Sequence, residues 1–308
     1  MRKLIALLLC LLLLAGCTAA PEKQEGIRFT DDTGAQVVAP EKPKKVAVLL
    51  SSLADLWITA GGTVDITVGE TVQRGFAEET VILVDEGAGK TVNLELLIQQ
   101  EPDLVIYSSD LSGQLSCAET LAQAGIPAAG FAVETFDDYL RVLKIFTEIL
   151  DTPERYETFG IALQGKIDAM IAAAQAVEAQ PDILFIRAGS SAKVTKAKTA
   201  QNHFVCVMLK QLGTFNIAEK APVLLDGLST EEILLSDPDV ILYTTMGDES
   251  ASGAFMESYL ADPVWSHLSA VRQGRVYQLP KELFQYKPNA RWGEAYAYLI
   301  QLLYGEIL

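Results

Sequence analysis

Residues 95–109 read ELLIQQEPDLVIYSS, and residues 231–245 read EEILLSDPDVILYTT. The two stretches align without a gap at an offset of 136 residues; each begins with a glutamate, carries a Pro-Asp pair and ends in a tyrosine before two hydroxyl residues. The runs 104–106 and 240–242 are continuously apolar, which is typical of strands covered on both faces in a parallel sheet. Each stretch therefore predicts a helix, a turn and a buried strand, and the repetition predicts two similar lobes.

Alternating helical and strand-like segments surround both stretches. Strands are expected at 46–50, 64–68, 103–107, 127–131, 182–186, 239–243 and 275–279, and helices at 53–60, 94–101, 115–124, 203–212, 230–236 and 255–261. Residues 27–39 precede them as a β-hairpin around an Asp-Thr-Gly turn. The alternation predicts an α/β fold of two Rossmann-like lobes with parallel sheets.

A long helical stretch separates the lobes. Thr135 is expected to cap a helix from Phe136, with Asp138 as its reciprocal partner, and Thr152 to cap a second helix that starts at Pro153. Residues 153–178 would span about 39 Å at 1.5 Å per residue, which is long enough to join the lobes stiffly. The expected divisions are a signal peptide at 1–16, a tether at 17–26, an N-terminal lobe at 27–135, connecting helices at 136–180 and a C-terminal lobe at 181–308.

The N-terminus has the pattern of an export signal. Arg2 and Lys3 precede an apolar run of 11 residues, 4–14, which is shorter than the roughly 20 residues that span a bilayer. The run ends in Leu-Ala-Gly-Cys17, which resembles a bacterial lipobox. We expect Cys17 to carry lipid, and the protein to be extracytoplasmic and anchored to the cell membrane. An ordinary signal peptide with a chance cysteine is the alternative.

Composition excludes several functional classes. The chain has 40 acidic and 24 basic residues, with a net charge of −16, so it is a poor partner for nucleic acid. Two histidines cannot supply a His-rich site for a bare metal ion, and no metal site is predicted.

Cys117 and Cys206 are expected to be buried free thiols. No nucleophile elbow or dinucleotide motif is present, and Gly89-Lys90-Thr91 lacks the first glycine of a phosphate loop, so neither an enzyme nor a bound cofactor is expected.

A ligand site is expected at the carboxyl ends of the strands, where parallel α/β sheets bind ligands. The segment 280–292, which follows the last strand, adds aromatic and cationic side chains that suit a bulky anionic ligand. The candidate residues of this cleft are Ser51, Ser52, Glu70, Tyr107, Ser108, Arg187, Asn202, His203, Thr244, Thr245, Met246, Phe284, Tyr286 and Arg291. Alternatives are a surface salt bridge for Arg187, a helix start for His203 and a core position for Tyr286. The lysines at 193, 196 and 198 are expected in a solvated loop.

Three segments resemble the class III substrate-binding proteins of ABC importers, which take up iron–siderophore complexes, haem or cobalamin. They are Phe29-Thr30-Asp31-Asp32 with Gly34, Asn93-Leu94-Glu95 followed by 101–106, and Gly274-Arg275-Val276-Tyr277. The resemblance covers about residues 27–308. It implies two Rossmann-like lobes, one long linking helix, a ligand cleft between the lobes, and a permease dimer with ATPase subunits as the partner.

The resemblance also implies that Glu95 and Glu231 dock onto the permease. A simpler explanation from the sequence is that both carboxylates stabilise helix N-termini capped by Asn93 and Ser229. The expected function is that of a monomeric protein that captures a metal chelate, an iron–siderophore or haem, and delivers it to the permease. A corrinoid-binding protein, a surface α/β enzyme and a ligand-sensing receptor are the alternatives.

Overall fold

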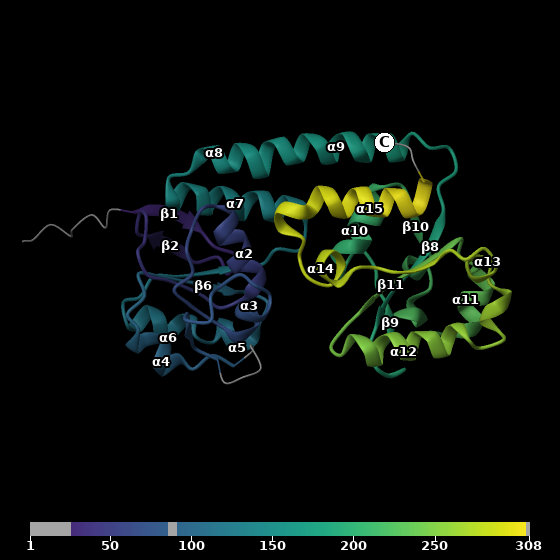
Figure 1. Ribbon diagram of the computed structural model, residues 1–308, viewed down its shortest axis with the longest axis horizontal. Helices are drawn as coiled ribbons and strands as arrows, with labels where there is room; N and C mark the ends of the chain where they lie inside the picture. The colour runs from purple at the N-terminus through teal and green to yellow at the C-terminus, as the bar shows by residue number, and fades with distance from the viewer. Residues whose placement is uncertain (1–25, 86–90, 306–308) are drawn as a thin grey trace, which may run out of the picture.

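The computed structural model describes residues 26–85 and 91–305, which form two lobes side by side (Figure 1). The predicted signal peptide, the lipidation site at Cys17 and the Gly89-Lys90 pair lie outside the described residues. Strands β1 to β7 belong to the lobe that we call the N-lobe, and β8 to β12 belong to the C-lobe.

The N-lobe is built on a five-stranded parallel sheet with the strand order β5-β4-β3-β6-β7. Its strands are β3 (Val46–Val48), β4 (Ile66–Thr67), β5 (Ile82–Leu83), β6 (Leu104–Ser108) and β7 (Ala128–Phe131). The predicted antiparallel hairpin, β1 (Ile27–Thr30) and β2 (Gln36–Ala39), is present beside it. The helices are α2 (Ser51–Thr59), α3 (Gly69–Gln73), α4 (Leu94–Gln99), α5 (Ser112–Leu115) and α6 (Ala118–Gln123).

The C-lobe sheet has the order β10-β8-β11-β12, with β9 paired antiparallel to β8. The strands are β8 (Asp182–Ala188), β9 (Lys196–Ala197), β10 (Phe215–Asn216), β11 (Val240–Thr245) and β12 (Val276–Gln278). The helices are α10 (Phe204–Gln211), α11 (Thr230–Ser236), α12 (Glu249–Leu260), α13 (Ser269–Arg272), α14 (Lys281–Phe284) and α15 (Trp292–Tyr304).

The internal repeat occupies corresponding places in the two lobes. Strands β6 and β11, which carry its apolar runs, are buried along their whole lengths. Each pairs in parallel with the strand that opens the sheet of its lobe, β6 with β3 and β11 with β8. This pairing buries both faces of the repeated strand, and it confirms the predicted α/β fold.

A continuous helical rod joins the lobes on one side of the molecule. It consists of α8 (Pro153–Tyr156), a π-helical turn η1 (Glu157–Ile161) and α9 (Ala162–Gln175), and it runs from the N-lobe to the C-lobe along α15 (Figure 1). Helix α7 (Phe136–Leu150) precedes it and begins with the predicted capping box of Thr135 and Asp138.

The prediction that Thr152 caps α8 is wrong. Its side chain makes no capping hydrogen bond, and Thr152 Oγ1 instead donates to the carbonyl oxygen of Ala60 at 2.7 Å. Arg155 Nη1 donates to the carbonyl oxygen of Thr59 at 3.0 Å. The carbonyls at the end of α2 need donors that the helix itself does not supply, and the rod provides them. The rod is thereby fixed to the N-lobe.

A shared hydrophobic core crosses the boundary between the lobes. One cluster of buried side chains includes residues of β3 and β6 together with residues of β8 and β11. At its centre the ring of Trp292 lies 6.0 Å from the ring of Phe136, which begins α7, and 5.6 Å from that of Phe204, which begins α10. The lobes therefore meet through close-packed aromatic rings as well as through the rod.

Candidate ligand-binding cleft

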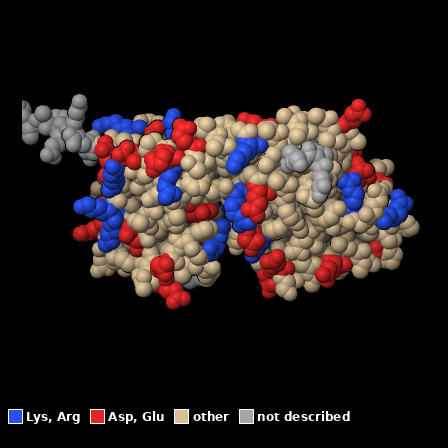
Figure 2. All heavy atoms as spheres, turned by 45° about the horizontal axis from the view of Figure 1, so that its top comes forward, with Lys and Arg blue, Asp and Glu red and all other residues tan. Residues whose placement is uncertain are grey.

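The boundary between the lobes is hollowed, with acidic and basic side chains together beside the hollow (Figure 2). A cavity of about 590 Å³ lies at this boundary. The residues that line it come from α2 and the end of α3 in the N-lobe, and from the start of α12 and the segment after β12 in the C-lobe. They are Asp55, Gln73, Arg74, Phe76, Glu249, Lys281, Glu282, Tyr286, Lys287, Pro288, Ala290 and Arg291.

Arg74 organises the N-lobe side of this cavity. Its Nη1 donates to Ser51 Oγ at 2.8 Å and to Ser52 Oγ at 3.1 Å, and Ser51 Oγ in turn donates to Glu70 Oε2 at 2.8 Å. Burial lowers the pKa of the Arg74 guanidinium, while the nearby carboxylates of Glu70 and Asp55 act in the opposite direction. Ser51, Ser52 and Glu70 are therefore brought together around an arginine that the sequence did not single out. Arg74 lines the cavity, whereas these three predicted cleft residues are not among its lining residues.

The segment 280–292, which we call the cleft strap, bonds to the N-lobe at several points. The guanidinium carbon of Arg74 lies 4.0 Å from the centre of the Tyr286 ring, a cation–π contact between the lobes. Asn289 Nδ2 donates to the carbonyl oxygen of Ser52 and to Asp55 Oδ2, both at 2.8 Å. Burial raises the pKa of the Asp55 carboxyl. Tyr286 therefore faces the cleft and does not lie in the core.

Four cations of the C-lobe act on one another or on His203, and we call them the cation cluster: Arg187, Lys196, Lys198 and Lys287. Of the four, Lys287 lines the cavity. Arg187 lies near the end of β8, directly opposite Lys196 on β9. Arg187 Nε is buried without a hydrogen-bond partner, and among the described residues neither Arg187, Lys196 nor Lys198 forms an ion pair. The prediction that Lys196 and Lys198 lie in a solvated loop is wrong, because both are partly buried.

Three cations of the cluster, Arg187, Lys196 and Lys198, are close enough for the other two to perturb Lys198. Burial lowers the pKa of Lys198, and Arg187 and Lys196 lower it further. Burial also lowers the pKa of Lys287, which Glu134 and Asp110 partly offset. Like charges in a partly buried site are unfavourable unless an anion joins them. The cluster is therefore suited to an anionic ligand.

His203 lies beside the cluster as a helix start, the alternative left open from the sequence. Its Nδ1 accepts a hydrogen bond from the backbone N–H of Val205 at 3.3 Å, and its ring lies 4.8 Å from that of Phe185 and 5.2 Å from that of Phe204. Burial, and then the charges of Lys287, Arg187 and Lys198, lower the pKa of His203 to about 3. The side chain is thus held neutral.

His203 should make the protein less stable as the pH falls. The unfolded chain binds a proton near pH 6.5, whereas the folded protein resists it down to about pH 3, so stability is lost below about pH 6.5. Between about pH 7.5 and pH 5 this loss amounts to about 2 kcal/mol. We expect His203→Asn, which keeps a capping oxygen, to lose less stability over that range in urea unfolding. Equal losses in parent and variant would contradict the assignment.

Several predicted cleft residues do not line the cleft in the structure. Phe284 is fully buried, 5.6 Å from the ring of Tyr298, because α14 packs this side chain against α15. Tyr107 points to the opposite face of its sheet, where it lines a cavity of about 370 Å³ with Asp31 and Thr33. Three of the candidates are buried at the ends of strands: Ser108, Thr244 and Thr245. Met246 is partly buried after β11, and Asn202 is exposed in the turn before α10. Arg291, by contrast, does line the cavity, where it is half-exposed and paired with Glu294 at 2.7 Å.

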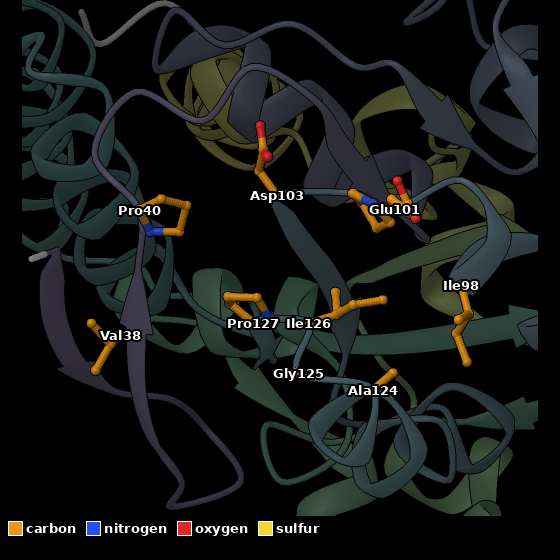
Figure 3. A pocket seen from close by; sticks show the side chains of 10 residues that line it. Val38, Pro40, Ile98, Glu101, Asp103, Ala124, Gly125, Ile126 and Pro127 are labelled. Atoms are coloured by element: carbon orange, nitrogen blue, oxygen red, sulfur yellow. The ribbon is translucent and has the colours of Figure 1, made fainter. Parts of the chain in front are cut away.

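Another cavity, of about 580 Å³, lies at the opposite end of the N-lobe sheet (Figure 3). It is lined by Val38, Pro40, Ile98, Glu101, Pro102, Asp103 and residues 124–127, which precede β6 and β7. Its charged lining residues are both acidic, which does not suit an anion. Within the described residues, no group of three or more His, Cys, Asp or Glu side chains is arranged to hold a metal ion.

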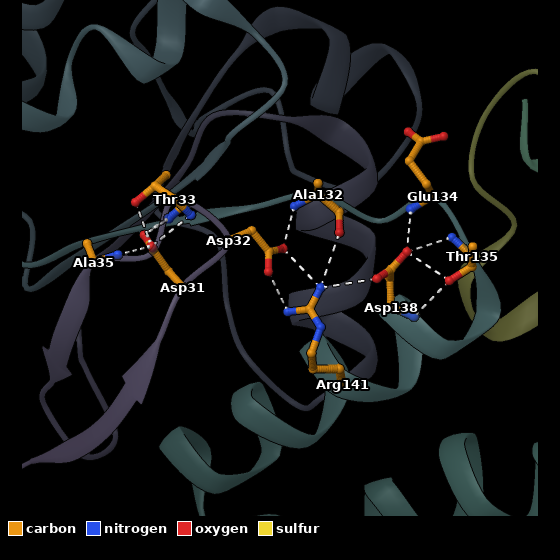
Figure 4. A network of polar contacts seen from close by, with 10 residues as sticks. Asp31, Asp32, Thr33, Ala35, Ala132, Glu134, Thr135, Asp138 and Arg141 are labelled. Carbon is orange, nitrogen blue, oxygen red and sulfur yellow. Dashed lines mark hydrogen bonds and ion pairs between the residues drawn. The ribbon is translucent and has the colours of Figure 1, made fainter. Parts of the chain in front are cut away.

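The loop after β7 brings an acidic residue, Glu134, to the cleft. Asp32 accepts a hydrogen bond from the backbone N–H of Ala132 and pairs with Arg141 at 2.8 Å, while Asp138 accepts from the backbone N–H of Glu134 at 3.2 Å (Figure 4). The hairpin turn and the start of α7 therefore fix this loop from both ends. The Glu134 side chain reaches Lys287 of the cleft strap, with Glu134 Oε2 and Lys287 Nζ 2.8 Å apart.

Two lobes around parallel sheets, a helical connector and a charged cleft between them define a bilobal binding protein. The family model described as periplasmic binding protein matches residues 46–283, which is more than half of the chain. The chain therefore belongs to the periplasmic binding protein family, a family of solute-binding proteins. Within the described residues, no helix has the length and apolar character needed to cross a bilayer.

Individual relatives are distant in sequence. The chain is 22% identical over 304 residues to the Fe(3+)-citrate-binding protein YfmC of Bacillus subtilis, covering 91% of this chain and 90% of the relative. The structure of Staphylococcus aureus SirA complexed with staphyloferrin B matches with a TM-score of 0.70 at 16% identity, covering 92% of this chain and 100% of that one. The apo form of the periplasmic heme-binding protein RhuT from Roseiflexus matches with a TM-score of 0.69 at 21% identity, covering 88% and 100%. These likenesses establish the fold.

Proposed function

We propose that this protein binds an anionic iron chelate in the cleft between its lobes and delivers it to an ABC permease. The observation that carries the proposal is the cation cluster, in which Arg187, Lys196 and Lys198 have no carboxylate partner among the described residues. In a chain with an excess of acidic residues, a cleft that keeps such cations favours a negatively charged ligand.

Ferric citrate and haem both carry carboxylates, and axial ligation of the iron is what favours ferric citrate here. The name of the Bacillus relative specifies ferric citrate, whose carboxylates match guanidinium and ammonium donors. Haem iron requires an axial ligand such as His, Tyr, Met or Cys. His203 already accepts a backbone hydrogen bond, and Tyr286 stacks on Arg74. A corrinoid carries amides where citrate carries carboxylates, so the cluster does not favour it either.

Direct titration tests the proposed ligand. Purified protein titrated with ferric citrate, citrate alone, haem and cobalamin should bind ferric citrate reversibly, with one site per chain and weaker affinity at higher salt. The buried tryptophans, including Trp292 at the lobe boundary, provide a fluorescence signal. Tight binding of haem with no response to ferric citrate would overturn the proposal, and so would turnover of the ligand.

Membrane anchoring is part of the proposed function and depends on Cys17. Acyl chains contribute about 0.8 kcal/mol per buried methylene group to membrane binding, whereas residues 18–26 offer no apolar face. We therefore expect Cys17→Ala to move the protein from the membrane fraction to the soluble fraction of cells. A variant that has lost its signal peptide and still sediments with membranes as the parent does would contradict the anchor.

Glu95 and Glu231 are proposed to contact the permease. Both are exposed in the first turns of α4 and α11, where Asn93 and Ser229 supply the capping bonds. Replacing both glutamates with alanine should reduce cellular uptake about tenfold, the change that corresponds to 1.4 kcal/mol, and leave ligand affinity unchanged. Glu119→Ala, in the first turn of α6, is the matched control. Uptake equal to that of the control would exclude this docking role.

A further inference from the structure

The two side chains of the ion pair between Glu134 and Lys287 differ in their exposure to solvent. The Lys287 side chain is 20% exposed, and its ammonium lies 4.6 Å from the centre of the Phe204 ring. The Glu134 side chain is 55% exposed. Moving the carboxylate into water costs little, because a half-exposed ion pair contributes only modestly to stability. Moving the ammonium would disrupt the packing of the cleft strap.

Lys287 belongs to the same charged site as the unpaired cations. Lys287, Arg187 and Lys198 all lower the pKa of His203, and Lys287 itself lines the cavity between the lobes. Among the ion pairs of the described residues, the pair with Glu134 is the one that brings a carboxylate to this cluster. Asp110, which is also exposed, acts on Lys287 electrostatically without a direct pair.

We propose that Glu134 and a carboxylate of the ligand compete for Lys287, so that Glu134 is a built-in competitor that lowers the affinity of the cleft. This inference rests on the proposed function, since it requires an anionic ligand at the cation cluster. Most residues of a binding site strengthen binding, whereas Glu134 weakens it. Removal of the Glu134 carboxylate therefore strengthens ligand binding. The ligand gains Lys287 only after the N-lobe carboxylate has released it.

Glu134→Gln isolates this effect because the loop is held by other atoms. The backbone N–H of Glu134 donates to Asp138, and Ala132 is held by Asp32, so neither bond involves the Glu134 carboxylate. The glutamine keeps the size of the side chain and loses its charge. Asp137→Asn is the matched control, since it removes an exposed carboxylate from the same part of the N-lobe, at the start of α7.

The test is a double-mutant cycle with ferric citrate as the ligand, measured by calorimetric titration. Glu134→Gln should tighten binding about two- to fivefold relative to both the parent and Asp137→Asn. Lys287→Met should weaken binding, and Glu134→Gln should then give no further gain in the Lys287→Met background.

Each outcome of the cycle has a distinct meaning. Unchanged or weaker binding by Glu134→Gln would overturn the inference and leave the proposed function intact, and so would a gain that persists without Lys287. If the parent itself binds no ferric citrate, the proposed function fails first, and the competition for a ligand carboxylate fails with it.

Discussion

Replacement of Trp292 by alanine should lower the free energy of unfolding by about 3–5 kcal/mol, the range for removing a large aromatic side chain from a core. Trp292 is 1% exposed, and its ring contacts Phe136 at the start of α7 and Phe204 at the start of α10. The void left by the missing indole ring would lie where the two lobes meet. We therefore expect urea unfolding of the variant to separate into two transitions, because the lobes would lose much of their shared core.

Trp265→Ala provides the control for this prediction. Trp265 is as deeply buried, but it packs on Tyr259 within the second hydrophobic cluster, which contains only C-lobe residues. Its loss should cost a similar free energy and destabilise the C-lobe alone. If Trp292→Ala costs less than about 1 kcal/mol, the boundary core does not contribute as described.

Replacement of Arg187 by alanine should weaken the binding of ferric citrate about 10- to 150-fold. This range corresponds to the 1.5–3 kcal/mol of a charge-assisted hydrogen bond. Arg187 is partly buried and its Nε has no hydrogen-bond partner, so a ligand carboxylate that reaches the guanidinium would satisfy a donor that the protein leaves unpaired. The loss should be measured by titration at low and at high salt, and it should shrink as salt increases.

Arg291→Ala is the corresponding control. Arg291 is also a cleft candidate from the sequence, but its side chain is 52% exposed and paired with Glu294, so its removal should change affinity much less. An Arg187→Ala protein that binds ferric citrate as well as the parent does would remove the basis for the proposed ligand.

The fold could be predicted from the sequence because its main strands are continuous apolar runs separated by helix caps. The repeat around Pro102 and Pro238 located the buried strand of each lobe, and the capping box at Thr135 located the start of α7. Strands β5, β9 and β10 were not predicted. Strands β9 and β10 have only two residues each and leave no recognisable period, whereas β5 lies in the apolar run 81–84, a signal that could have located it.

The cleft was less predictable because its composition depends on the path of the cleft strap. Ser51 and Arg187 could be identified because they lie at the carboxyl ends of predicted strands. Arg74 could not, because its position in the cleft depends on its contact with the Tyr286 ring. Phe284 and Tyr286 are two residues apart, and the sequence does not show which of them faces α15. Lys198 has cationic neighbours because β9 folds back onto β8, a pairing with little local signal.

If the protein delivers its ligand to a permease as proposed, the rod of α8, η1 and α9 has a kinetic consequence for import. The connector is fixed to α2 and the cleft strap bonds to the N-lobe, so we expect only small rotations of the lobes on binding. The empty and the loaded protein would then present nearly the same outline. A transporter that recognises this outline would bind both forms with similar affinity. Empty copies would then act as inhibitors, and the rate of uptake would depend on the saturated fraction of the pool and not on its total abundance.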